Sequence, residues 1–151
     1  MIQGKWLSPG SDLSSVLPIR NAVFSRGEDS LDAVSWSVLV YQDSVPAATG
    51  RIWWEDGAFR IGDICVLEEY RGMRLGDLVL RLLLFKAQSH SAREVRLRCP
   101  HHLTGFFSRL GLREQPSDDP SEIEMMIEGS SIDLDSCKNC PKSSCPNRKP
   151  T

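Results

Sequence analysis

The sequence contains no apolar run of about 18 residues, so we expect no membrane span. Its first residues, MIQGKWLSPG, lack the basic start and apolar core of a secretory signal, and we therefore expect a cytoplasmic protein. The sequence also lacks the Lys-Ser/Thr ending of a nucleoside-triphosphate P-loop and the three-glycine pattern of dinucleotide-binding folds. These absences exclude two large classes of nucleotide-binding protein.

Acidic residues are scarce in the middle of the chain and basic residues are absent just after it. Residues 71–113 contain nine Lys or Arg and two acids, whereas residues 117–135 contain seven acids and no base. The basic middle could attract anions, although basic side chains dispersed over a solvated surface would give the same counts. No aromatic and basic surface pattern or recognition helix accompanies it, so we rank nucleic-acid binding last.

The hydrophobic pattern predicts one domain with both helices and strands. Apolar spacing indicates a helix over 13–24, bent or started at Pro18. Further elements are predicted as strands over 36–41, 47–55 and 59–67, a helix over 75–88, a strand over 94–99, a short helix over 103–110 and a strand over 122–128. The fold class is therefore α/β (α+β), with a mixed, mostly antiparallel central sheet and one parallel β-α-β crossover.

A glycine-bearing turn lies between the third predicted strand and the apolar helix. Gly72 and Gly76 permit close approach of a ligand to the backbone, and Arg71 and Arg74 could surround an anion with positive charge. The helix that follows adds the positive end of its dipole. The turn thus fits a phosphate, although any tight strand-to-helix turn can require glycine.

The order of elements and two motifs over residues 2–128 resemble the GNAT superfamily of acyl-CoA-dependent N-acyltransferases. The first motif is Arg71-Gly72-Met73-Arg74-Leu75-Gly76 after the lead-in VLEEY, with Arg74 in place of the central glycine. The second is FFSRLGL over 106–112, where Phe107 replaces the usual tyrosine. The segments IRNAVF, GRIWW and LRCPHHLTGFFSRLGL look most like a small bacterial subgroup with an R-x-x-V-F segment.

This resemblance implies that backbone amides of the turn hold the pyrophosphate of coenzyme A and that the neighbouring strand positions the pantetheine arm. The residues implied in acetyl-CoA binding are Ile64, Cys65, Val66, Arg71, Gly72, Met73, Arg74, Leu75, Gly76, Phe106 and Phe107. The expected reaction is direct transfer of an acetyl group from acetyl-CoA to a primary amine of a small molecule or a protein. The alternative is a non-catalytic acyl-CoA-binding or sensing module. A second copy of the chain, forming a homodimer, is a further candidate partner.

Proton transfer is the least determined part of the expected site. For the general base, the resemblance favours Asp63, because family members often carry an acid on this strand. Asp63 could instead be a strand residue that pairs with Arg60 or a neighbouring arginine. His101 and His102 follow the strand over 94–99 and could titrate near neutrality, but a loop role suits them better.

No acid replaces the missing tyrosine in an obvious way. Phe107 has no proton to give, so water, Ser108 or Cys99 would have to protonate the leaving thiolate. Cys99 fits a quiet buried thiol better than an acyl-carrying nucleophile. Trp53 and Trp54 point to opposite faces of one strand, so at most one can line the cleft.

The last residues form a cysteine-rich tail. We divide the chain into a GNAT-like domain over 1–129 and a tail over 130–151 that contains Cys137, Cys140 and Cys145. The Cys-x-x-Cys spacing gives half of a zinc or iron-sulfur site, with a histidine or a second chain as the missing ligand. A flexible tail with redox-active thiols, or an incidental disulfide, is the favoured alternative.

Overall fold

The computed structural model describes residues 1–117 and 121–134. Within these ranges the chain forms seven strands, three α-helices and several single 3-10 turns. The strands are β1 (Ile2–Leu7), β2 (Trp36–Gln42), β3 (Val45–Glu55), β4 (Ala58–Val66), β5 (Glu94–Cys99), β6 (Arg113–Gln115) and β7 (Ile123–Glu128). The helices are α1 (Leu17–Phe24), α2 (Leu75–Ser89) and α3 (Thr104–Ser108).

All seven strands belong to one sheet, in the order β1-β2-β3-β4-β5-β7-β6. Neighbouring strands are antiparallel except β4 and β5, which are parallel and joined through α2. The predicted mixed sheet with one β-α-β crossover is therefore confirmed.

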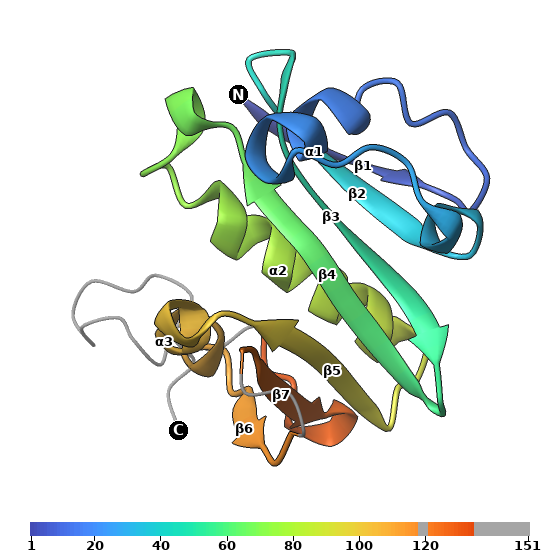
Figure 1. The fold of residues 1–151 in the computed structure, drawn as a ribbon, viewed down its shortest axis with the longest axis vertical. Coiled ribbons are helices and arrows are strands. Elements are labelled where there is room, and N and C mark those ends of the chain that lie inside the picture. Colours follow the sequence, from blue (N-terminus) through green and yellow to red (C-terminus); the bar gives the residue numbers. More distant parts are fainter. Residues whose placement is uncertain (118–120, 135–151) are drawn as a thin grey trace.

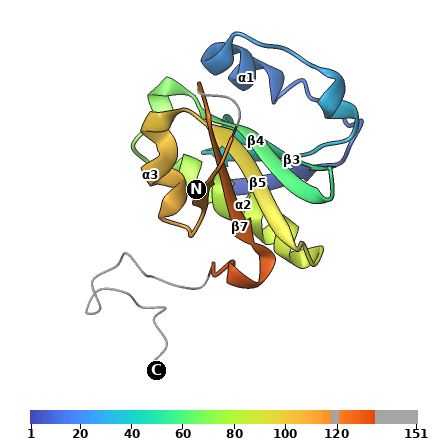
Figure 2. The ribbon, with the colours of Figure 1, turned by 60° about the horizontal axis from the view of Figure 1, so that its bottom comes forward.

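Helices cover the two faces of the sheet unequally. Helix α2 crosses one face and α1 lies over the opposite face of the β1–β4 half (Figures 1 and 2). In the part of the chain that the structure describes, α1 does not extend over β5 and β7. The larger core lies between α2 and the sheet, and a smaller one joins α1 to β2 and β4 through residues such as Ile19, Leu39 and Cys65. This uneven cover leaves one end of the sheet open to a ligand.

Gly50 explains how closely α2 approaches the sheet. A Cβ atom on Gly50 would lie 2.7 Å from a Val79 methyl and 3.0 Å from a Leu83 methyl, both on α2. Because a side chain is excluded there, the helix sits directly on β3 and β4 and its N-terminus is fixed beside the end of β4.

Four details differ from the sequence prediction. Helix α1 begins at Leu17 and has Pro18 in its first turn, where a missing N–H costs nothing. The structure adds β1 and β6, which form the two edges of the sheet, and shortens α3. Beyond β7, in the segment predicted to be part of the tail, Ile132 packs onto the domain. The Ile132 carbonyl accepts a hydrogen bond of 2.9 Å from Gln88, and the Ile132 side chain is buried in the core. The division into a domain and a tail stays a prediction.

Candidate active site

The two parallel strands separate immediately after they meet. Among the described residues, β4 and β5 pair only at Phe59 with Val95 and at Arg60 with Arg96, and the residues of both strands that follow diverge. The free edge of β4 from Gly62 to Val66 therefore faces a cleft instead of a neighbouring strand. Backbone N–H and C=O groups on that edge are available to a ligand with an amide backbone of its own.

The turn 71–76 stands at the open end of this cleft. Gly72 has φ +87° and is surrounded by open space, and the Arg71 guanidinium donates to the Val66 carbonyl at 3.2 Å. Arg74, the N-cap of α2, has φ +61° and offers no side-chain cap to the helix. The first N–H groups of α2 thus have neither an intrahelical acceptor nor a cap, which is the arrangement that binds phosphate.

A cavity of about 1130 Å³ extends from this turn along the cleft. Near the turn it is lined by Ile64, Cys65, Val66, Arg71, Gly76, Phe106 and Phe107. Farther along, Trp53, Asp63 and Arg98 contribute, together with Glu122 and His102. Seven of the eleven predicted acetyl-CoA residues therefore line one cavity; Gly72, Met73, Arg74 and Leu75 belong to the adjoining turn. Trp54 is exposed, as strand alternation predicted.

Asp63 lies at a bulge in β4, with φ +52°, where the register with β3 shifts. Its carboxylate is surrounded by three arginines. Arg51 lies 2.8 Å from Oδ2, Arg20 lies 3.8 Å from it, and Arg26 contacts Oδ1. The second interpretation of Asp63, pairing with neighbouring arginines, matches this geometry, although Arg60 is not among them.

Two further aspartates form hydrogen bonds with two of these arginines. Arg20 forms two hydrogen bonds of 2.8 and 3.0 Å to Asp32, and Arg51 forms bonds of 2.6 and 2.9 Å to Asp29. The hydrogen bonds from Arg51 lower the pKa of Asp29 to about 2. This arginine-aspartate cluster joins α1, the loop after it, β3 and the β4 bulge into one rigid wall.

A second cluster lies on the open face of β4, β5 and β7. The buried Glu124 carboxylate accepts from Arg60 at 2.9 Å, Arg96 at 3.1 Å and Arg98 at 3.2 Å. Burial raises the pKa of Glu124, but these hydrogen bonds outweigh it and keep the pKa below its ordinary value. Glu122, in the bend just before β7, is exposed and forms no ion pair within the described residues. No local sequence signal marked it as a candidate.

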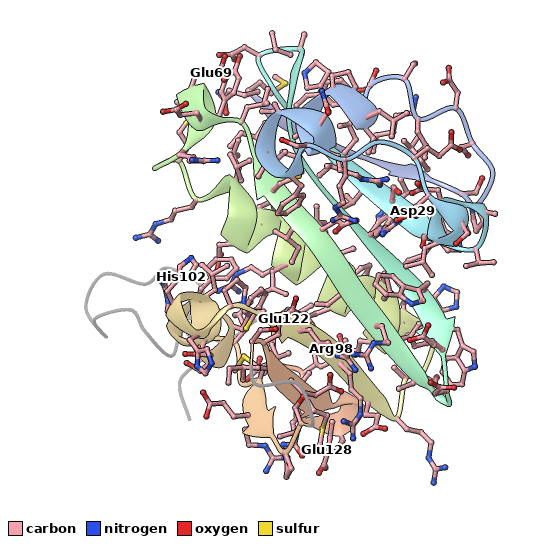
Figure 3. The ribbon with its side chains drawn as sticks, viewed as in Figure 1. Asp29, Glu69, Arg98, His102, Glu122 and Glu128 are labelled. Carbon is pink, nitrogen blue, oxygen red and sulfur yellow. The ribbon has the colours of Figure 1, made fainter. Side chains whose placement is uncertain are left out.

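The two thiols of the site and Phe107 are buried, and Phe106 is half-buried. Burial raises the pKa of Cys65 to about 12 and also raises the pKa of Cys99. Both are therefore protonated thiols, which agrees with the quiet role expected for Cys99. Phe106 and Phe107 meet edge to face at 5.0 Å, and Phe107 is buried in the cavity wall. His102 lies on the 3-10 turn after β5 (Figure 3).

The predicted metal ligands Cys137, Cys140 and Cys145 lie outside the described residues. Across residues 1–117 and 121–134, no cluster of three or more His, Cys, Asp or Glu side chains could hold a metal ion. In the same part of the chain, no helix has the length and hydropathy needed to cross a membrane.

Comparison with known proteins agrees with this geometry. The sequence profile of the acetyltransferase (GNAT) family matches residues 13–112. A Bacillus subtilis (strain 168) protein, whose name assigns it provisionally to the acetyltransferases, is 28% identical over 138 residues, covering 83% of this chain and 88% of its own.

Solved structures share the fold. An acyl-CoA N-acyltransferase from Pseudomonas aeruginosa superposes with a TM-score of 0.74 at 20% identity, covering 83% of this chain and 99% of its own. A GNAT family acetyltransferase from Elizabethkingia anophelis, solved with acetyl-CoA bound, gives 0.67 at 15% identity, with 84% and 97% covered. The chain belongs to the acetyltransferase (GNAT) family, and its enzyme class is N-acetyltransferase.

Proposed function

We propose that the protein transfers an acetyl group from acetyl-CoA to a primary amine of a small molecule or a protein, by direct attack within a ternary complex. The observation that carries the proposal is the cleft between β4 and β5, with the turn 71–76 and the uncapped N-terminus of α2 at its mouth. The Elizabethkingia anophelis structure with bound acetyl-CoA supports the identity of the donor.

In this proposal the pyrophosphate binds the N–H groups of the turn and of the first turn of α2, and Arg71 and Arg74 add positive charge. The pantetheine amides bind the free edge of β4 at Ile64 to Val66, which leaves the thioester near the bulge. Phe107 packs against the arm but cannot donate a proton. The thiolate of coenzyme A is a tolerable leaving group near neutral pH, so the missing tyrosine slows the reaction without preventing it.

Calorimetric titration of the purified, metal-analysed protein with acetyl-CoA tests the first half of the proposal. Release of free thiol is then followed over a panel of small amines and peptides. Binding together with amine-dependent thiol release supports transfer and begins to define the acceptor. Binding without release over the panel would favour the acyl-CoA-sensing alternative, and no binding would refute the site.

A further inference from the structure

The cleft holds four carboxylates, and the structure separates their roles. Glu55, Asp56, Asp63 and Glu122 all line the cavity. Glu55 and Asp56 belong to the turn between β3 and β4, at the end where β4 and β5 are still paired. They are therefore far from the open part of the cleft in which the thioester would lie.

Asp63 lies at the bulge, and its carboxylate forms ion pairs with arginines, although its buried Oδ2 accepts no hydrogen bond from the described residues. Three arginines surround it, and two of them, Arg20 and Arg51, are 1% and 3% exposed. The carboxylate is therefore engaged in neutralising two buried arginines. Its position suits it to holding the bulge and the neighbouring wall in place.

Glu122 is the fourth carboxylate of the cavity. The register of the sheet explains why it does not join the ion pairs that Glu124 forms. Glu124 lies directly opposite Arg98 and takes the guanidinium groups of β4 and β5. Glu122 immediately precedes β7, one residue beyond Ile123, which pairs with Cys99 at the end of β5. Figure 3 places Glu122 between Arg98 and His102, on the open face of the sheet.

We propose that Glu122 is the general base of the acetyl transfer, an inference that rests on the function proposed above. Its carboxylate accepts, directly or through one water, the proton that the amine nitrogen loses as the bond to the acetyl carbon forms. The carbon-sulfur bond breaks, coenzyme A leaves as the thiolate, and the proton on Glu122 passes to that thiolate or to water. Two electrons move from nitrogen to carbon and two from carbon to sulfur, so no oxidant or metal is required.

Several charged groups line the same cavity as Glu122 or lie on the neighbouring strands. They are Arg98 on β5, Arg60 on β4, His102 on the turn after β5, Glu124 on β7 and Glu114 on β6. Arg98 and Arg60 donate hydrogen bonds to Glu124, so their guanidinium groups are directed at Glu124 and not at Glu122.

The test compares Glu122→Gln with Glu128→Gln. Glu128, the last residue of β7, is exposed and does not line the cavity. Initial rates of thiol release are measured from pH 5 to 9 with the best amine of the panel, and with water as acceptor if no amine is used. We expect Glu122→Gln to lose about 100-fold or more in kcat/KM and to lose the fall in rate at low pH. Glu122→Asp should restore part of the rate, and Glu128→Gln should match the wild type.

Calorimetry on the same proteins separates this proposal from the function itself. Glu122→Gln should bind acetyl-CoA as the wild type does, because Glu122 lies away from the turn 71–76. Wild-type rate and pH profile in Glu122→Gln would overturn the base assignment alone. If the wild type neither binds acetyl-CoA nor releases thiol, the proposed function and this inference fail together.

Discussion

Gly76 offers the sharpest test of the donor site, because two substitutions there differ only by a carboxylate. A Cβ atom at Gly76 would lie 3.6 Å from a Val66 methyl and 3.7 Å from the Phe106 ring, which are ordinary contacts. Gly76→Ala should therefore fold and bind acetyl-CoA. Gly76→Asp places a negative charge among the N–H groups proposed for the pyrophosphate. At about 4 Å and an effective dielectric constant of about 20, that repulsion is about 4 kcal/mol, or roughly 1000-fold in affinity.

Stability must be measured beside affinity, since a misfolded variant would also fail to bind. An acid in the first turn of a helix interacts favourably with the helix dipole, by about 0.3–1 kcal/mol, so Gly76→Asp should melt no lower than the wild type. Calorimetric titration with acetyl-CoA and thermal unfolding of both variants complete the assay. If Gly76→Asp binds acetyl-CoA within threefold of the wild type, the assignment of the turn is refuted.

Three further predictions concern backbone strain and the arginine-aspartate cluster. Arg74 occupies the left-handed region, so Arg74→Val should lose about 1–2 kcal/mol of stability in chemical unfolding, whereas Arg74→Gly should stay near the wild type. The pKa of Asp29 is about 2 in the folded state, against the ordinary value of 3.8 taken for the unfolded chain. Its contribution to the free energy of unfolding is therefore complete above about pH 4 and is lost as the pH falls toward 2. Because its side chain is 36% exposed, screening reduces that contribution to about 1 kcal/mol, and Asp29→Asn should flatten the acid unfolding curve by that amount. Asp63→Asn should cost about 2 kcal/mol of stability by leaving Arg51 and Arg26 partly unpaired, yet keep the low-pH fall in rate; loss of that fall with unchanged stability would identify Asp63 as the base.

Elements with strong hydrophobic periodicity were predictable from the sequence, and the edges of the sheet were not. Strand β5 and the start of α2 match their predicted bounds, because alternation and near-continuous apolar spacing are local signals. Strand β1 reads IQGKWL, with Gly4 and Lys5 in its middle and four exposed residues, so it has no buried face to reveal it. Its existence depends on pairing with β2, some 35 residues later, and β6 has only three residues.

The proposed donor half of the site followed from a motif that is continuous in sequence, whereas the proposed acceptor half depends on distant contacts. The turn 71–76 carries its own glycines and leads directly into α2. By contrast, Asp63 meets Arg20 and Arg26 only because α1 packs over the β4 bulge. The sequence left Asp63 between two interpretations, since nothing local indicates how many arginines converge on one carboxylate.

The register of β5 and β7 makes the remaining distinction, between Glu124 of β7 and Glu122 just before that strand. Glu124 is opposite Arg98 and forms ion pairs with Arg60 and Arg96, so its negative charge is balanced by these arginines. Among the described residues Glu122 has no cross-strand partner on β5, and it lines the cavity. A shift of two residues in the register of β7 would instead place Glu122 opposite Arg98 and Glu124 opposite Arg96. Which glutamate joins the arginine cluster is therefore decided by strand pairing, a property that neither residue carries in its own sequence neighbourhood.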